Sequence, residues 1–326
     1  MKHVIFILPF LLFIACKSKE EAPYDFKEYH AQQDYQFEFD HSYKMFSEPT
    51  SYDFASYYLF ENKMLIGNRS KTNFGVDIQE YTTKRLIHHI DRWEGAEGKD
   101  SINAVVKDMA MNEKYIFILQ ENSQVEVFDT NNYGHITTIG TGKWNYTRQG
   151  LVGGNGLLLI ENQLFVRDRE KLSVFDVSQL DKMKAGSLTS MAISSTLPQN
   201  NFIVQFMKFH DRIYFTDVAN KAIYSFAYHK YHQGDQIHID KRISLTVEAY
   251  GICTMNQDII ISSKDRKFYT ITDASGSIEN FPIVGYSNRD LGRIFCKNNT
   301  FWFSDTSRNY VARCNIKSRQ TEAVSQ

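Results

Sequence analysis

One pair of strand-like segments recurs six times along the 326-residue chain. In each copy, a short apolar segment is followed by a polar turn and then by a second segment of strand-forming residues. The residues at the centre of the first segments lie 42 to 52 positions apart. We refer to them as the anchor residues: Leu65, Phe117, Phe165, Tyr214, Ile260 and Trp302.

This repeat predicts an all-β fold, a six-bladed β-propeller with four-stranded antiparallel blades. An apolar segment precedes several anchors, as at 202–210, and a fourth strand-like segment follows others, as at 135–140. Repeats of this length and composition are typical of propeller blades. Helical periodicity is nearly absent from the chain. An aligned β-sandwich is the competing fold, but nothing in a sandwich requires one four-strand unit to recur six times.

A propeller ring must also be closed, and two segments offer the missing strand. One is YQFEFD at 35–40 and the other is TEAVS at 321–325. We favour the N-terminal strand, because it accounts for strand character upstream of the first repeat. The charged Lys317 and Arg319 beside the C-terminal segment suit an exposed edge instead. The propeller is therefore predicted to span residues 35–326.

Composition limits what the blades contain and what they bind. Aromatic residues make up 14% of the chain, and we expect most of them to fill the gaps of about 10 Å between packed sheets. The formal net charge of −1 predicts no basic face and so no nucleic-acid partner. Cys253, Cys296 and Cys314 match no zinc spacing and are expected in the core. One disulfide among the three is permitted in an oxidising compartment, and its pairing stays open.

The N-terminus carries a targeting signal. Residues 4–15 form an apolar run of twelve residues after Met1, Lys2 and His3, too short for a membrane span of about 20 residues. Residues 1–15 are therefore predicted to be a signal peptide. The run ends in Ile14-Ala15-Cys16, which resembles a bacterial lipobox and implies cleavage before Cys16 and lipidation of its thiol. Residues 16–34 would form a tether.

Two short motifs bear on location and modification. Lys19, Glu20 and Glu21 resemble the surface-export signal of Bacteroidetes lipoproteins, which implies display on the cell surface at the outer membrane. The alternative is an ordinary solvated tether on a protein that faces the periplasm. Asp100-Ser101-Ile102 resembles the acceptor for O-glycosylation in the same group and lies in a polar segment.

Together, the lipobox, the acidic tether and the six divergent repeats resemble the TolB-like six-bladed β-propeller lipoproteins of Bacteroidetes. The likeness covers most of the mature chain. Gly140 and Gly142 match the start of the Gly-x-Gly-Pro-Gly-Glu turn found between blades in that group, whereas the Pro-Gly-Glu is absent. The resemblance implies a propeller associated with envelope or nutrient-uptake machinery, and it implies no specific ligand.

Catalytic and metal motifs are scarce. The sequence contains no Gly-x-Ser-x-Gly elbow, HExxH motif, P-loop or EF-hand loop. The histidine-rich stretch at 228–240 offers possible metal ligands, but His229 and His232 would face opposite sides of a strand. An exposed outer hairpin is the favoured interpretation. No metal and no cofactor are predicted.

The predicted innermost strands line the central channel and contain one acidic side chain, that of Asp108. The polar residues around it suit an anionic or polar ligand better than a cation. These residues are Lys107, Gln205, Lys208, Tyr250 and Arg293.

The loops that lead into the innermost strands supply the candidate ligand-binding residues. Aromatic rings provide stacking surfaces, and arginines provide planar donors for carboxylate or phosphate. Such a set at the channel mouth also suits sugars and peptides. The candidates are Trp144, Tyr146 and Arg148 before the third blade and Tyr286, Arg289 and Arg293 before the sixth.

The sequence thus favours a non-enzymatic binding or scaffold propeller. Its partner would be an envelope protein complex or an extracellular glycan or peptide. The alternative is a propeller hydrolase or lyase that acts at the channel mouth. A cluster of carboxylates or a metal at the mouth would favour the enzyme, and a rim of aromatic rings and arginines would favour binding.

Overall fold

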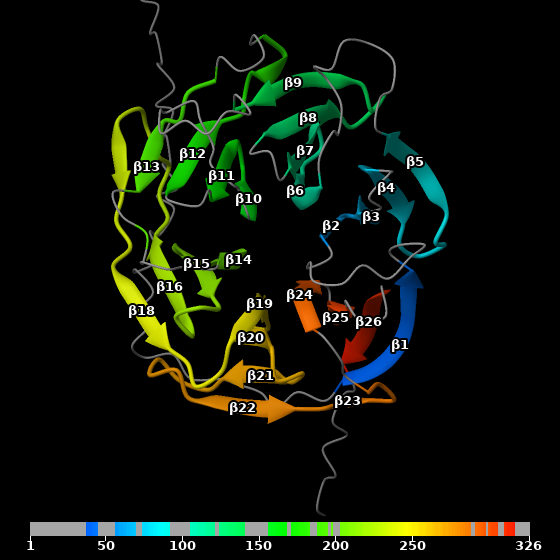
Figure 1. Cartoon of the computed structure of the whole chain (residues 1–326), viewed down its shortest axis with the longest axis vertical. Helices are drawn as coiled ribbons and strands as arrows, with labels where there is room; N and C mark the ends of the chain where they lie inside the picture. The colour runs from blue at the N-terminus through cyan, green and yellow to red at the C-terminus, as the bar shows by residue number, and fades with distance from the viewer. Residues whose placement is uncertain are drawn as a thin grey trace, which may run out of the picture.

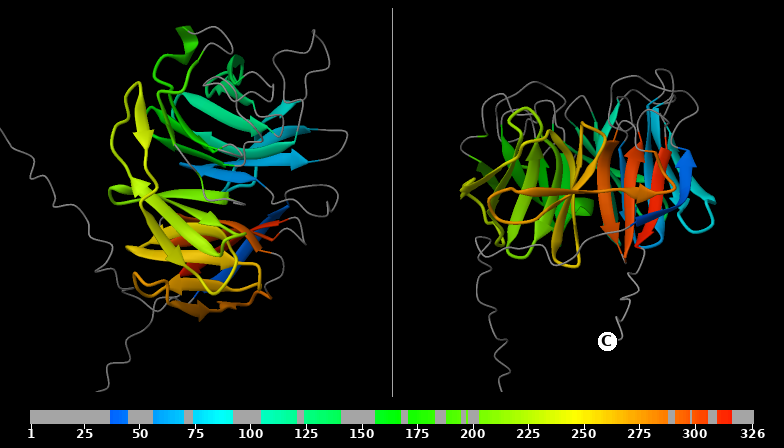
Figure 2. Two further views of the ribbon diagram at one scale, coloured as in Figure 1. Left: turned by 60° about the vertical axis from the view of Figure 1, so that its left-hand side comes forward. Right: turned by 90° about the horizontal axis from the view of Figure 1, so that it is seen from below.

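Six antiparallel sheets surround a central axis in the computed structural model of the chain (Figure 1). Each sheet is one blade, and the edge-on view shows the strands running between the two faces of the ring (Figure 2). The predicted six-bladed propeller is thereby confirmed. The structure describes residues 37–44, 56–69, 74–91, 105–120, 124–140, 156–167, 171–182, 188–194, 197, 203–287, 291–297, 299–305 and 310–316.

The first three blades follow each other along the chain, with strands given from the axis outward. Blade 1 contains β2 (Tyr57–Phe60), β3 (Lys63–Arg69), β4 (Phe74–Glu80) and β5 (Leu86–Asp91). Blade 2 contains β6 (Val106–Met111), β7 (Tyr115–Gln120), β8 (Val125–Asp129) and β9 (His135–Ile139). Blade 3 contains β10 (Gly156–Ile160), β11 (Gln163–Arg167), β12 (Leu172–Asp176) and β13 (Ala192–Ser194), with the short helix η2 (Leu180–Lys182) between the last two.

The last three blades continue the same order. Blade 4 contains β14 (Ile203–Phe209), β15 (Arg212–Asp217), β16 (Ala222–Ala227) and β18 (Lys241–Ser244). Blade 5 contains β19 (Ala249–Met255), β20 (Asp258–Ser263), β21 (Phe268–Ile271) and β22 (Ile278–Phe281). Blade 6 contains β24 (Leu291–Lys297), β25 (Thr300–Asp305), β26 (Tyr310–Ile316) and β1 (Phe37–Lys44).

Two short strands extend this pattern at the rim. β17 (Asp235–Ile237) pairs in parallel with β13 of blade 3, and β23 (Ile283–Val284) pairs in parallel with β1. The stretch at 228–240 therefore lies on the outside of the ring as expected, but the hairpin predicted there is wrong. Local sequence carries no signal for a parallel pairing with a strand some 40 residues earlier.

The ring is closed by its N-terminal strand, as predicted. β1 runs antiparallel to β26, from Phe37 opposite Ile316 to Lys44 opposite Tyr310 (Figure 1). The first described strand is thus the outermost strand of the last blade. The competing closing segment at 321–325 lies outside the described residues.

Tight turns join the innermost strand of a blade to its second strand. In the β2–β3, β10–β11, β14–β15 and β19–β20 hairpins, two residues separate the paired strand ends. The first residue of each turn adopts a positive φ, as two-residue hairpins often require: Glu61 (49°), Glu161 (53°), His210 (51°) and Asn256 (49°). We call the face of the ring that carries these turns the turn face. No long loop from these four hairpins can cover the channel there.

The core consists of apolar clusters between neighbouring blades. All six anchor residues are at most 2% exposed, as expected for side chains that fill these gaps. Between blades 5 and 6, the Phe301 ring lies 4.9 Å from that of Phe37 and 5.0 Å from that of Phe268. The N-terminal strand therefore contributes to the core as well as to the backbone ladder.

No helix among the described residues is long and apolar enough to cross a membrane.

Truncation of Phe37 tests this closure. Phe37 is fully buried, so Phe37→Ala should lower the free energy of unfolding by about 3–5 kcal/mol, through lost burial and the cavity left behind. The neighbouring Glu38 is exposed, and Glu38→Ala should change it by less than about 0.5 kcal/mol. Denaturant unfolding followed by circular dichroism would measure both. Equal small effects would mean that β1 does not hold the ring closed.

Candidate functional site

The innermost strands of the six blades converge on the axis (Figure 1). Four of them, β6, β14, β19 and β24, are interrupted by a β-bulge near their first residues. A bulge turns a side chain away from its regular direction and leaves backbone groups without ladder partners. The bulges can therefore direct side chains into the channel near the first residues of these strands. They also leave backbone groups there that need hydrogen-bond partners.

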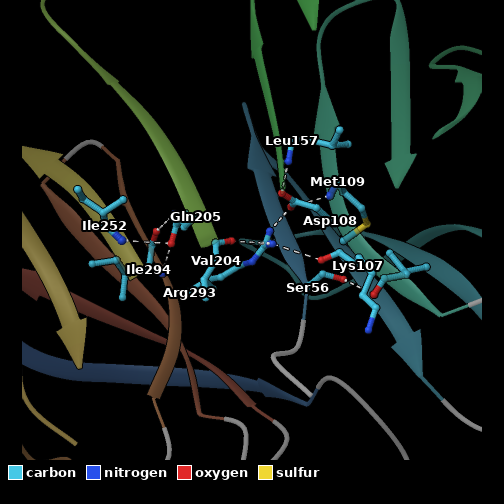
Figure 3. Close-up of polar contacts among 11 residues, drawn as sticks. Ser56, Lys107, Asp108, Met109, Leu157, Val204, Gln205, Ile252, Arg293 and Ile294 are labelled. Atoms are coloured by element: carbon cyan, nitrogen blue, oxygen red, sulfur yellow. Dashed lines mark hydrogen bonds and ion pairs between the residues drawn. The ribbon is translucent and has the colours of Figure 1, made fainter. Parts of the chain in front are cut away.

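Asp108, near the start of β6, is the central hydrogen-bond acceptor among the side chains in the channel. Its Oδ1 forms an ion pair with Nη1 of Arg293, which comes from blade 6, on the far side of blade 1 (Figure 3). The same carboxylate accepts hydrogen bonds from the backbone N–H of Met109 (2.8 Å) and of Leu157 (2.6 Å). Asp108 is 3% exposed, so three donors compensate one buried negative charge.

Arg293 is equally enclosed, with an exposed fraction of 3%. Its Nη2 donates to the carbonyl oxygens of Val204 (3.1 Å) and Lys107 (3.3 Å), while its own carbonyl accepts from the Tyr57 hydroxyl (3.2 Å). The guanidinium thus binds backbone groups of two blades in addition to Asp108.

Gln205 completes the layer from blade 4. Its Nε2 donates to the carbonyl of Ile294 (2.6 Å), and its Oε1 accepts from the N–H groups of Ile294 (3.1 Å) and Ile252 (3.3 Å) (Figure 3). We call Asp108, Gln205 and Arg293 the polar plug. Its hydrogen bonds reach the innermost strands of all six blades.

Burial raises the pKa of Asp108, and the charge of Arg293 opposes that shift. A buried carboxylate with a raised pKa favours folding at low pH, where it is protonated, and disfavours folding as the pH rises through its folded pKa. The guanidinium is therefore what makes the ionised form tolerable at neutral pH.

Removal of the guanidinium tests this assignment. Arg293→Met leaves the Asp108 carboxylate buried without its counter-charge and should lower the free energy of unfolding by about 3–5 kcal/mol at neutral pH. The loss should shrink as the pH falls toward about 4, because protonation then neutralises Asp108.

Urea unfolding over that pH range would measure the effect. The control is Arg242→Met, which alters an exposed arginine and should cost less than about 1 kcal/mol at every pH. A small, pH-independent loss in Arg293→Met would contradict a buried, ionised pair.

A pocket lies on the turn-face side of the polar plug, with a volume of about 200 Å³. The plug forms its floor, and we call it the channel pocket. Its lining beyond the plug is apolar or aromatic except for Thr254, and all six innermost strands contribute. The wall includes Tyr58, Leu158, Phe206, Met207, Cys253 and Phe295.

Aromatic contacts order one side of this wall. The Phe295 ring lies 4.9 Å from the Tyr57 ring and 5.8 Å from the Tyr58 ring, edge to face in both cases. Burial and the nearby charge of Asp108 raise the pKa of Tyr58 to about 12. The phenol of Tyr58 is therefore neutral in the physiological range.

A disulfide forms another part of the wall. Cys253 on β19 is bonded to Cys296 on β24, which links the innermost strands of blades 5 and 6. Cys314 is a free, buried thiol whose pKa is raised by burial. The sequence left the pairing open, since three cysteines offer three choices and their spacing favours none.

Reduction of this bond should destabilise the ring. The bond closes a loop of 43 residues, for which chain entropy predicts a contribution of about 2–4 kcal/mol. We expect dithiothreitol and the double substitution Cys253→Ser with Cys296→Ser to lower the free energy of unfolding by similar amounts. Thiol titration under denaturing conditions would confirm reduction. Unchanged unfolding after verified reduction would contradict the expectation.

The candidate residues predicted from sequence are only partly described. Arg293 lies in the polar plug rather than at the rim. Tyr286 lies over blade 6, where its ring packs 5.0 Å from Phe39 and its hydroxyl donates to Asp305 (2.7 Å). The role of both in ligand binding stays a prediction. Trp144, Tyr146, Arg148 and Arg289 lie outside the described residues, as do Cys16, Lys19, Glu20 and Glu21.

The sequence missed the ion pair and the pocket. Asp108 and Arg293 are 185 positions apart, and their only common signal is the same early position in an innermost strand. The sequence predicted that the channel suits an anionic or polar ligand, but the charge of Arg293 is already matched by that of Asp108. Within the described part of the chain, no group of three or more His, Cys, Asp or Glu residues is placed to hold a metal ion.

Comparison with known proteins identifies the fold of the chain but no family. No protein-family model and no curated protein sequence matches it. The β-propeller domain of Cps50 (Swd1) from Myceliophteria thermophila is similar in structure, with a TM-score of 0.53 and 8% identity over 86% of this chain and 100% of that chain. This likeness shows the propeller fold alone.

Two other solved structures have lower TM-scores. Hsv2 from Kluyveromyces lactis has a TM-score of 0.48 and 11% identity, covering 80% of this chain and 84% of that chain. BamB from Moraxella catarrhalis has a TM-score of 0.45 and 12% identity, covering 79% of this chain and 71% of that chain.

Proposed function

We propose that this protein is an envelope lipoprotein, similar to the TolB-like propellers of Bacteroidetes, that acts as a non-enzymatic binding or scaffold propeller. Its partner is an envelope protein complex or an extracellular glycan or peptide. The lipid anchor is Cys16, and Lys19, Glu20 and Glu21 direct the protein to the cell surface. The fold supports this role, because the ring offers two broad faces and a central pocket on a rigid frame.

One observation carries the proposal over the hydrolase or lyase alternative. Asp108 supplies the only carboxylate among the described residues that line the channel pocket, and it accepts hydrogen bonds from Arg293 and from two backbone N–H groups. A general base must instead offer a lone pair to the substrate proton it removes. Asp108 thus supports the blades, and what the pocket presents is a surface for binding.

The course of β1 supports an anchor on the turn face. Thr300, which follows the β24–β25 turn, pairs with Asn315, and Asn315 pairs with Glu38 on β1. The chain before Phe37 therefore joins the ring at the turn face. Cys16 precedes Phe37 by a segment of 20 residues, which spans at most about 70 Å when fully extended. A lipid at Cys16 would therefore attach the ring to the membrane from its turn face, within that distance.

The disulfide supports an envelope location. Bonds of this kind persist in oxidising compartments and are rare in the cytosol. Cys253 and Cys296 lie in the wall of the channel pocket. The redox potential of the compartment therefore also determines whether that wall contains a disulfide or two thiols.

Isolation of the native protein tests the proposal. We expect the lipoprotein to fractionate with the outer membrane, to be cleaved by protease added to intact cells, and to co-purify with an envelope partner after mild solubilisation. Cys16→Ser should release it from the membrane, because the acyl chains that anchor it are lost. Mass spectrometry would identify what co-purifies.

A matched variant separates anchoring from export. Replacement of Lys19, Glu20 and Glu21 by alanine should leave the protein in the membrane but protect it from external protease. Equal membrane binding by the Cys16→Ser variant would reject the lipid anchor. Recovery of the native lipoprotein without any partner, and without affinity for glycans or peptides in a binding screen, would reject the binding role.

A further inference from the structure

Building on the binding role proposed above, we propose that the channel pocket binds one uncharged aromatic ring of the size of benzene or phenol, which enters from the turn face. The ring belongs either to a small aromatic molecule or to a phenylalanine or tyrosine side chain of a peptide. The two sources share one chemistry, and the experiment below separates them.

The size of the pocket sets the size of the ligand. Its volume is about 200 Å³. An apolar protein cavity of about 150 Å³ is known to accept one benzene molecule. The channel pocket therefore accommodates a single six-membered ring with a small substituent and has no room for a second ring beside it.

The wall chemistry selects an aromatic ring over other apolar groups. The rings of Tyr58, Phe206 and Phe295 line the pocket, and aromatic pairs in offset or edge-to-face contact gain free energy beyond that of area burial. The sulfur-containing residues Met109, Met207, Cys253 and Cys296 belong to the same lining. Sulfur–aromatic contacts are also favourable, whereas an aliphatic group would gain from burial alone.

The floor excludes charged ligands. Asp108 and Arg293 neutralise each other, and both are also bonded to backbone groups. Gln205 is bonded to three backbone groups. A ligand that carries a charge would lose its hydration in the pocket without gaining a free counter-charge there.

The exposure of the lining residues shows that the channel pocket opens toward the turn face. The plug residues are 3–6% exposed, whereas Leu158, Thr254 and Phe295 retain intermediate exposure. The hairpins that border this face have two-residue turns at four blades. The floor is therefore closed, and the opening is on the side from which the N-terminal strand enters the ring.

Ligand-observed NMR on the purified full-length chain tests the inference. The neutral probes are toluene, p-cresol and N-acetyl-phenylalanine amide, and the charged probes are benzoate and benzylammonium. We expect saturation transfer to the neutral probes and none to the charged ones. Binding of toluene and p-cresol without the amide would assign a free small molecule, and binding of the amide as well would assign a peptide side chain.

Two variants on one strand localise the binding. Leu158→Trp fills the pocket and should weaken binding of p-cresol by at least about tenfold. Leu159→Trp alters the next residue of β10, which is similarly exposed but does not line the pocket, and should leave the affinity unchanged. Thermal unfolding would verify that both variants are folded.

A measurement on the unmutated chain guards against misfolded variants. With methyl-labelled methionine, p-cresol should shift the resonance of Met207, which lines the pocket, but not that of Met64, which is buried between other strands. Absence of neutral-probe binding, equal binding of charged probes, or an unmoved Met207 resonance would overturn the inference. Recovery of an envelope partner in that case would leave the proposed scaffold role intact.

Discussion

The middle of the ring depends on one buried ion pair, between Arg293 of blade 6 and Asp108 of blade 2. A propeller brings six innermost strands to one axis, where bulged backbone must find hydrogen-bond partners away from bulk water. Asp108 supplies an acceptor and Arg293 supplies donors for these backbone groups, and Gln205 adds a second bridge to blades 5 and 6. Buried charge is costly, and it is tolerated here because each charged group is paired and hydrogen-bonded.

The same plug divides the channel and so shapes the site. It closes the floor with hydrogen-bonded polar groups and leaves an apolar pocket of about 200 Å³ on the turn face. The disulfide between Cys253 and Cys296 fixes two of the strands that form the wall. Structural support and the proposed binding surface are thus two sides of one layer, and the N-terminal strand joins the ring on the side where the pocket opens.

Much of the fold could be predicted from the sequence, because the information is local and repeated. The spacing of the anchors from Leu65 to Trp302 implied six blades, and the strand character around Phe37 implied N-terminal closure. The site could be predicted less well. The match of Asp108 with Arg293 joins residues 185 positions apart and depends on bulges that only the packed ring creates. The sequence therefore suggested Arg293 as a ligand-binding residue, whereas in the ring its guanidinium binds Asp108 and backbone carbonyl groups.

A double-mutant cycle on this pair tests the account most directly. The free energies of unfolding of Arg293→Met, Asp108→Leu and the double variant would be measured at neutral pH. If the pair holds the plug together, each single variant leaves an uncompensated group, and the double variant should be more stable than the sum of the single losses predicts by at least about 1 kcal/mol. Additivity within about 0.5 kcal/mol would contradict the central role of the pair.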